Sequence, residues 1–363
     1  MIRSKFADPL YRFIRDGKAG YIDGDGKIII EPKLDLFSNK YGEFHDGLLL
    51  TNSFDGRFTT TFGKVAFDKR YCVTYDFSEG LAGVSETWTG KWGYINTAGD
   101  SVITPRFEYA SSFSDGLAAI ELNDRWGYID RTGRILIPPQ FVFAGNFHEG
   151  MACVIVEGPC TQVEHGPCGS SRVIPGNGLL SIQVPPCKYG FIDRSGSLIT
   201  SNGYDFASEF SEGLAPVQLG AKWGYIDKKG QIVIEPKFDK ANLFSEGFAL
   251  VQQGRLAGFI DRTGSFVIPA QFEYAEDFSD GLAVVGFSII SHKENKGHID
   301  RAFWYINKQG KQAIPEAFDL ASSFFKGLAH VRLKLHKKDE NGESSEPGPF
   351  AYINTTGETV FTY

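Results

Sequence analysis

The pentapeptide Trp126-Gly127-Tyr128-Ile129-Asp130 decides the fold, because it is one copy of a signature that recurs along the chain. The signature returns as Trp92-Gly93-Tyr94-Ile95-Asn96 and as Trp223-Gly224-Tyr225-Ile226-Asp227. Weaker copies begin at Ala19, Tyr189, Ala257, Phe303 and Phe350. Self-similarity of this kind predicts a tandem repeat architecture.

Other positions recur with the signature, whose first residue we call the tryptophan slot. A glycine follows seven residues later, at Gly26, Gly99, Gly133, Gly196, Gly230, Gly264, Gly310 and Gly357. A second glycine ends a Phe-x-x-Gly step, whose phenylalanines include Phe113, Phe147 and Phe244. The same spacing reveals a degenerate copy that begins at Gly56 and reaches Gly80, so we count nine units.

The predicted units together fill one array over residues 1–363. Their approximate bounds are residues 8–46, 47–79, 80–115, 116–149, 150–212, 213–246, 247–280, 281–326 and 327–363.

Each unit is predicted to contain three strands. Strand a is the stretch Gly116–Ile120, strand b is the signature, and strand c precedes a proline, as at Val233 and Ile234. Strands b and c are joined by Asp-x-x-Gly, which is hairpin chemistry because the carboxylate binds nearby backbone and glycine accepts a positive φ. We expect the segment from Phe238 to Gly247, between strand c and the next strand a, to form one helical or 3₁₀ turn.

The fold class is therefore all-β. The first unit begins with its own strand a at Leu10–Ile14, and the last ends with its own strand c at Thr359–Phe361. Since no unit is split between the two ends, we expect an open, twisted solenoid or superhelix of three-stranded units. A closed, propeller-like ring is the alternative.

The signature, the strand-a motif Gly-Leu-Ala and the Phe-Ser-x-Gly step resemble the bacterial WG (or KWG) repeat family over almost the whole chain. Tryptophan itself fills its slot only at Trp92, Trp126 and Trp223. The resemblance implies a β-repeat protein that acts as an interaction module, and it carries no catalytic residue over to this chain.

Composition excludes several classes of partner. The formal net charge is −7 and basic residues are scattered, so we expect no nucleic-acid binding. No run of about 18 apolar residues occurs, so no membrane span is expected. The N-terminal stretch lacks the apolar core of a secretory signal, which predicts a cytoplasmic protein.

Three insertions between strands a and b are private to single units: Glu157–Pro186, Phe287–Ala302 and Lys334–Pro349. We expect them to project from one edge and to carry partner contacts. The first holds Cys160, His165, Cys168 and Cys187, which are ligand types for zinc without the usual Cys-x-x-Cys spacing. Reduced thiols, a zinc site and a disulfide all remain open there; otherwise no cofactor is expected.

Recurring polar and aromatic slots have two interpretations each. The acid before the second glycine, as at Asp115 and Glu246, either favours the turn or forms a carboxylate ladder between units. The basic residue before the tryptophan slot, as at Lys91, either stacks on rings or is solvated. The aromatic slots are predicted to be core, with a stacking platform for sugars or bases as the alternative.

No motif of a hydrolase, metalloprotease, nucleotide-binding or dinucleotide-binding enzyme is present, so we expect no enzyme. The predicted function is a protein-binding scaffold or adaptor, because stacked repeats supply extended binding surfaces. A glycan or cell-wall binder, which should expose rings at one slot of successive units, is the second hypothesis. An enzyme with a site across neighbouring units is the third.

Overall fold

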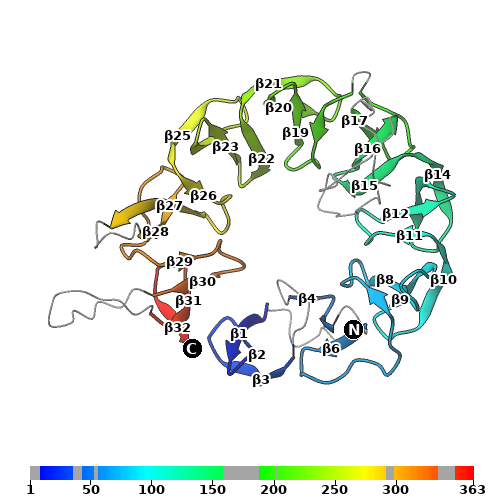
Figure 1. Ribbon diagram of the computed structural model, residues 1–363, viewed down its shortest axis with the longest axis horizontal. Helices are drawn as coiled ribbons and strands as arrows, with labels where there is room; N and C mark the ends of the chain where they lie inside the picture. Colours follow the sequence, from blue (N-terminus) through cyan, green and yellow to red (C-terminus); the bar gives the residue numbers. More distant parts are fainter. Residues whose placement is uncertain are drawn as a thin grey trace. The chain divides into compact units, whose positions relative to one another are not determined.

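A computed structural model describes residues 9–35, 43–52, 56–157, 188–200, 203–291, 298–333 and 348–363. Within these ranges the chain forms 32 strands and no helix, arranged as a succession of small antiparallel sheets (Figure 1). The prediction of an all-β repeat protein is confirmed.

The strands of the first four sheets follow chain order: β1 (Tyr11–Arg15), β2 (Lys18–Ile22) and β3 (Ile28–Leu34); β4 (Phe44–His45), β5 (Leu48–Asn52) and β6 (Arg57–Thr60); β7 (Val73–Thr74), β8 (Leu81–Ser85), β9 (Trp92–Asn96) and β10 (Ser101–Phe107); β11 (Tyr109–Ala110), β12 (Leu117–Leu122), β13 (Arg125–Asp130) and β14 (Ile135–Phe141).

The next five sheets contain β15 (Phe143–His148), β16 (Met151–Glu157) and β17 (Lys188–Asp193); β18 (Phe206–Ala207), β19 (Leu214–Leu219), β20 (Lys222–Asp227) and β21 (Ile232–Phe238); β22 (Lys240–Ser245), β23 (Phe248–Gln253), β24 (Leu256–Ile260) and β25 (Phe266–Phe272); β26 (Tyr274–Ala275), β27 (Leu282–Ser291) and β28 (His298–Asn307); β29 (Leu320–Ala321), β30 (Leu328–Arg332), β31 (Phe350–Asn354) and β32 (Thr359–Thr362).

The prediction of three strands per unit is wrong for five of these nine sheets, which have four. In the sheet β11-β12-β13-β14, strands a, b and c are β12, β13 and β14. The extra strand, β11, pairs with the far edge of strand a, with Tyr109 opposite Glu121 and Ala110 opposite Ile120. Four antiparallel strands in chain order are the blade of a β-propeller.

The segment expected to form a helical or 3₁₀ turn is instead this short strand followed by a tight hairpin. Asp115 and Gly116 have φ values of 52° and 75°, and Ser114 and Leu117 exchange backbone hydrogen bonds around them. Two consecutive residues at positive φ form a type I′ turn, whose twist matches that of antiparallel strands. The rings of the segment still point into the core, because Phe113 is 1% exposed.

The hairpin chemistry expected between strands b and c is confirmed. Asp130 Oδ1 accepts hydrogen bonds from the backbone N–H groups of Thr132 and Arg134, at 2.9 and 3.1 Å. Gly133 donates its N–H to the Asp130 carbonyl and has a φ of 86°. Asp193, Asp227 and Asp261 hold their turns in the same way.

Neighbouring sheets share their core through one aromatic pair per repeat. The ring of Tyr128 on β13 packs edge-on against Phe147 of the following sheet, with centroids 4.7 Å apart, and its hydroxyl donates to the Gly145 carbonyl. Equivalent pairs are Tyr21–Phe44, Phe58–Phe77, Tyr94–Phe113, Phe191–Phe210, Phe259–Phe278 and Tyr305–Phe324. In these pairs, each sheet completes its interior with a ring from the next one.

The chain divides into two compact units. One contains residues 1–15, 22–28 and 237–363, and the other contains residues 16–21 and 29–236. The first unit thus includes residues from both ends of the sequence.

Within that first unit, strand β1 packs on the last sheet of the chain. Tyr11 donates its hydroxyl to the Lys326 carbonyl at 2.7 Å, and Tyr352 donates its own to the Arg12 carbonyl at 2.6 Å. Phe13 is fully buried and packs edge-on against Phe361, with centroids 5.0 Å apart. The expectation of an array with separate ends is wrong, because the first strand packs on the last sheet within this unit.

Much of the second insertion is regular structure and not a loop. Strands β27 and β28 pair over ten residues each, from Leu282 opposite Asn307 to Ser291 opposite His298. The extra residues of Phe287–Ala302 therefore lengthen one hairpin. The first and third insertions lie almost wholly outside the described residues, at 158–187 and 334–347.

Candidate binding surface

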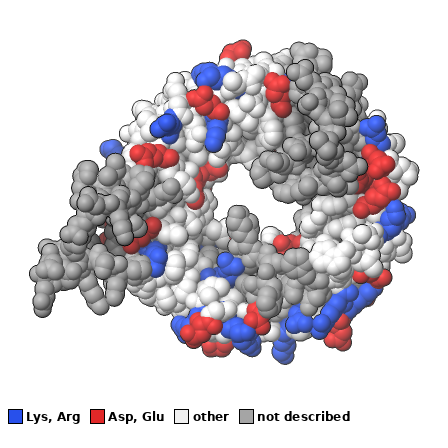
Figure 2. Space-filling model, viewed as in Figure 1, with Lys and Arg blue, Asp and Glu red and all other residues white. Residues whose placement is uncertain are grey.

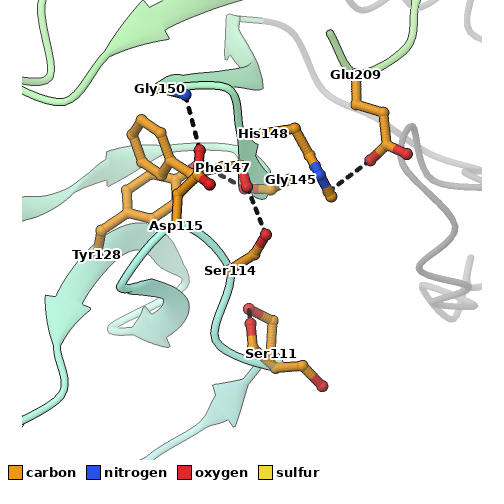
Figure 3. A network of polar contacts seen from close by, with 10 residues as sticks. Ser111, Ser114, Asp115, Tyr128, Gly145, Phe147, His148, Gly150 and Glu209 are labelled. Atoms are coloured by element: carbon orange, nitrogen blue, oxygen red, sulfur yellow. Dashed lines mark hydrogen bonds and ion pairs between the residues drawn. The ribbon is translucent and has the colours of Figure 1, made fainter. Parts of the chain in front are cut away.

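The acids before the second glycine connect consecutive repeats. The carboxylate of Asp115 accepts a hydrogen bond from the Gly150 N–H at 2.7 Å (Figure 3). Equivalent bonds join Asp46 to Gly80, Glu79 to Gly116, Glu149 to Gly213, Glu246 to Gly281 and Asp280 to Gly327. The acid therefore adopts the turn conformation, and its carboxylate binds the glycine N–H of the next turn.

A recurring basic residue, which the sequence analysis missed, reaches the same turns from the neighbouring repeat. It follows the Asp or Asn that opens the b–c turn. Lys228 Nζ lies 3.0 Å from Glu149 Oε2, Lys308 Nζ lies 3.3 Å from Glu246 Oε2, and Arg194 donates to the Asp115 carbonyl. The signal in the sequence was the repeated Arg or Lys at this slot.

The serine of the Phe-Ser-x-Gly step adds a third bond between repeats. Ser114 Oγ donates to the Phe147 carbonyl at 2.6 Å (Figure 3). Ser78, Ser245 and Ser279 donate to the corresponding carbonyls of Phe113, Phe278 and Phe324. His148 replaces serine in one repeat and pairs with Glu209 of the next, with Nε2 2.7 Å from Oε2.

The lysine before the tryptophan slot forms ion pairs where its contacts are described. Lys91 lies 3.3 Å from Glu108, and Lys188 pairs with Asp205. Asp205 also accepts the Gly220 N–H of the a–b turn at 2.7 Å. The hydrogen bond from Lys188 is the main cause that holds the pKa of Asp205 below its usual range. These slots therefore brace the a–b end of each sheet.

The aromatic slots lie mainly in the core. Trp92, Trp126 and Phe143 are buried, and with Tyr75 and Tyr109 they form a continuous row of ring contacts. The exposed large aromatic side chains of the described residues occupy six different slots of the repeat: Phe62, Trp88, Phe266, Tyr274, Phe287 and Phe325. No slot in this part of the chain repeats an exposed ring, as a glycan-stacking row would require.

Exposed aliphatic side chains, by contrast, recur at the start of strand c. The third residue of the strand, such as Ile137, is buried, whereas Ile135 and Leu136 before it are 40% and 44% exposed. We name this set the apolar row; its members are Val102, Ile135, Leu136, Leu198, Ile232 and Val233, all in one compact unit. Repeated exposure of apolar side chains at the first two positions of strand c is what a contact surface would show.

Strand c is also the edge strand of each four-stranded sheet, yet it is poorly suited to pair with another strand. Prolines interrupt it at Pro105, Pro138, Pro139, Pro236 and Pro269, and its register against strand b shifts at bulges. Prolines and bulges at sheet edges prevent non-specific strand addition. A partner would therefore contact the apolar row through side chains and not by adding a strand to the sheet.

Two carboxyl groups have raised pKa values. Burial raises the pKa of Asp76, which His45 lowers and Glu43 raises further. Among the residues that the structure describes, none forms a hydrogen bond with the buried Asp76 Oδ1. Burial likewise raises the pKa of Asp277, but both of its oxygens accept bonds from the Asn242 amide. Asp277 therefore has a structural partner, whereas Asp76 is an ionisable group with an unused acceptor.

The metal candidates Cys160, His165, Cys168 and Cys187 all lie outside the described residues. Cys153 is described and buried, with its Sγ 3.9 Å from the Ala207 carbonyl oxygen. Among the residues with described positions, no three His, Cys, Asp or Glu side chains gather as a metal site would require.

The described surface is mixed in charge. Acidic and basic side chains alternate over the face drawn in Figure 2. A search of the described ranges finds no helix with the length and apolar character that crossing a membrane demands.

Comparisons with solved structures give weak likenesses. A virginiamycin B lyase from Staphylococcus aureus is 11% identical with a TM-score of 0.32, over 84% of this chain and 92% of that one. The dihydro-heme d1 dehydrogenase NirN is 11% identical with a TM-score of 0.42, over 86% and 71%. PorZ of Porphyromonas gingivalis is 8% identical with a TM-score of 0.34, over 98% and 51%. No curated protein matches the sequence.

The family comparison is decisive. The profile described as "WG containing repeat" matches seven segments, at residues 20–50, 92–126, 126–158, 189–223, 223–256, 258–286 and 305–334. These segments cover more than half of the chain. Each runs from strand b of one sheet to strand a of the next, as 92–126 does from β9 to β12, and they omit the degenerate copy at Gly56. The chain belongs to the WG repeat family.

Proposed function

We propose that this chain is a non-catalytic scaffold that binds a partner protein through the apolar row. The observation that carries the proposal is the recurrence of exposed aliphatic side chains at the first two positions of strand c, although the core uses only the third. Burying apolar surface is the main driving force of protein association, at about 25 cal/mol per Å². A partner that presents a matching apolar face would gain this energy at several repeats at once.

The rigid frame beneath the row supports this function. Glycine, serine and acid contacts tie each turn to its neighbour, so that the exposed side chains are held at regular intervals. A repeat scaffold with fixed spacing loses little conformational entropy when it binds an extended partner.

The test compares two double variants of the full-length chain as baits in lysate of the native cell. Leu136→Lys with Val233→Lys places two charges in the apolar row. Gln140→Lys with Gln231→Lys adds the same charge at exposed positions close by, on β14 and directly before β21. The proposal expects the first variant to lose at least tenfold in affinity for the captured partner and the control to retain it. Equal binding by both variants would reject the row.

The private insertion is tested separately, since it is the other candidate contact. A chain in which an Asn-Gly turn replaces residues 158–187 should keep β16 and β17, whose pairing runs from Met151–Asp193 to Glu157–Lys188. Retained melting temperature with lost binding would place the partner on the insertion. Lost binding in the row variant alone would place it on strand c.

A further inference from the structure

One junction between repeats holds a histidine–carboxylate pair in place of the serine hydrogen bond. Where the Phe-Ser-x-Gly step keeps serine, the hydroxyl donates to a backbone carbonyl of the next repeat, as Ser114 does to Phe147. At the junction between sheets β15-β16-β17 and β18-β19-β20-β21, His148 occupies the serine slot. Its imidazole points at the Glu209 carboxylate, with Nε2 2.7 Å from Oε2 (Figure 3).

The repeats of this chain supply an internal comparison for that pair. Histidine fills the serine slot twice, at His45 and His148, and in both cases an acid precedes the phenylalanine of the following repeat, at Asp76 and Glu209. Where serine fills the slot, the corresponding residues are Ser112, Asn146, Leu243, Asp277 and Ser323. The only acid among these five, Asp277, is bound by the Asn242 amide. Histidine and a partner acid thus replace the hydroxyl as a set.

The charges around His148 favour its protonated form. The hydrogen bond that His148 donates to Glu209 raises the pKa of His148 most, burial opposes this, and the carboxylates of Asp115 and Glu149 raise it further. Two bases face the same turns: Arg194 donates to the Asp115 carbonyl, and Lys228 pairs with Glu149. Arg194 and Lys228 thus contact Asp115 and Glu149, and Glu209 is the direct partner of the imidazole.

We propose that His148 and Glu209 form a proton-operated latch between these two sheets, closed when His148 is protonated and weakened when it is neutral. A group whose pKa is raised by folding stabilises the folded state below its ordinary pKa, about 6.5 for histidine. That stabilisation is lost as pH rises through the raised value. The latch therefore loosens on going from mildly acidic to neutral and alkaline pH.

The experiment follows the imidazole and the junction together in the full-length chain. His Cε1–H resonances are titrated by NMR in the wild type and in Glu209→Gln. Amide exchange protection at residues 149–152 and 210–214 is measured between pH 5.5 and 8. The serine junction at residues 114–117 of the same molecule is the matched control. We expect the His148 midpoint to lie above about 6.5 and to fall towards it in Glu209→Gln.

The protection data give an independent outcome. Protection at the latch relative to the serine junction should fall as pH rises in the wild type, and should stay constant in His148→Ser, which installs the residue found at the other junctions. A His148 midpoint at or below about 6.5, or an identical pH response in Glu209→Gln, would overturn the latch. If His148→Ser does not fold, the wild-type and Glu209→Gln titrations decide the question alone.

Discussion

At the scale of single residues, the turn acid has an unfavourable backbone conformation and a favourable hydrogen bond. Left-handed backbone is unfavourable for a residue with a Cβ, yet Glu79, Glu149 and Glu246 all have φ near 53°. The bond that each carboxylate accepts from the glycine of the next repeat offsets this strain. The sequence showed that an acid recurs, but only the stacked repeats show what it binds.

Two replacements of Glu246 separate the contribution of its hydrogen bond from that of its ion pair. Glu246→Ala removes the acceptor of the Gly281 N–H and the partner of Lys308, and should lower the free energy of unfolding by about 1–2 kcal/mol. Glu246→Gln keeps an acceptor oxygen and loses only the partly exposed ion pair, worth under about 1 kcal/mol. Urea unfolding of both variants measures the difference; equal losses would mean that the hydrogen bond contributes nothing.

The glycine of the signature is needed for a different reason, because a side chain has no room at this position. A Cβ at Gly127 would lie 2.5 Å from the Ile137 carbonyl oxygen and 2.7 Å from the Pro139 nitrogen, because bulged strand c crosses closely over strand b. Gly127→Ala should therefore destabilise the chain by about 2 kcal/mol or more. Gly220→Ala is the control, since nothing lies within 4 Å there and only its φ of 61° opposes the change. Thermal unfolding compares the loss of stability in the two variants. A smaller loss in Gly127→Ala than in Gly220→Ala would contradict the proposed steric clash.

At the scale of elements, the strand that the sequence analysis missed is only two residues long in most sheets. Tyr109 and Ala110 are too short for a periodicity to show, and they pair only because strand a lies beside them. The hairpin β27–β28 is the opposite case. Its extra length breaks the spacing of the repeat and so appears as an inserted loop, although it continues the ladder of the sheet.

Shortening that hairpin should leave its sheet intact. Joining Phe287 to Ala302 through an Asn-Gly turn removes pairs outside the shared scaffold and keeps those from Leu282–Asn307 to Phe287–Ala302. We expect circular dichroism to be unchanged and the melting temperature to shift by no more than about 4 °C. A chain that no longer folds cooperatively would show that the extension is part of the scaffold.

At the scale of the whole molecule, residues from the two ends of the chain build one core. Tyr11, Phe13 and Ile22 cluster with Leu328 and Tyr352. Burial raises the pKa of Tyr363 to about 12, and its hydroxyl lies 2.8 Å from His330 Nε2. These contacts make β1 a structural part of the unit that contains the last sheets.

Phe13→Ala should consequently cost about 3–5 kcal/mol, the usual loss for a fully buried phenylalanine. Ile14→Ala, at a side chain that is 45% exposed, should be nearly neutral. Hydrogen exchange should show the loss at β31 and β32 as well as at β1. Normal protection of the last sheet in Phe13→Ala would contradict a shared core.

The sequence by itself determined the all-β class, the repeat and the b–c turns, because these depend on local spacing and on Asp and Gly chemistry within a few residues. It also identified the buried rings, since one aromatic slot per repeat has to fill one core. Only the tertiary structure decided the fourth strand, the contacts between turns, and the packing of the first strand on the last sheet. Each of these joins residues from different repeats, such as Asp115 with Gly150 or Tyr352 with Arg12, and their pairing energy appears only when the repeats are stacked. The apolar row belongs to the same class: Leu136 and Ile137 look alike in the sequence, and only the neighbouring sheet determines which one is buried.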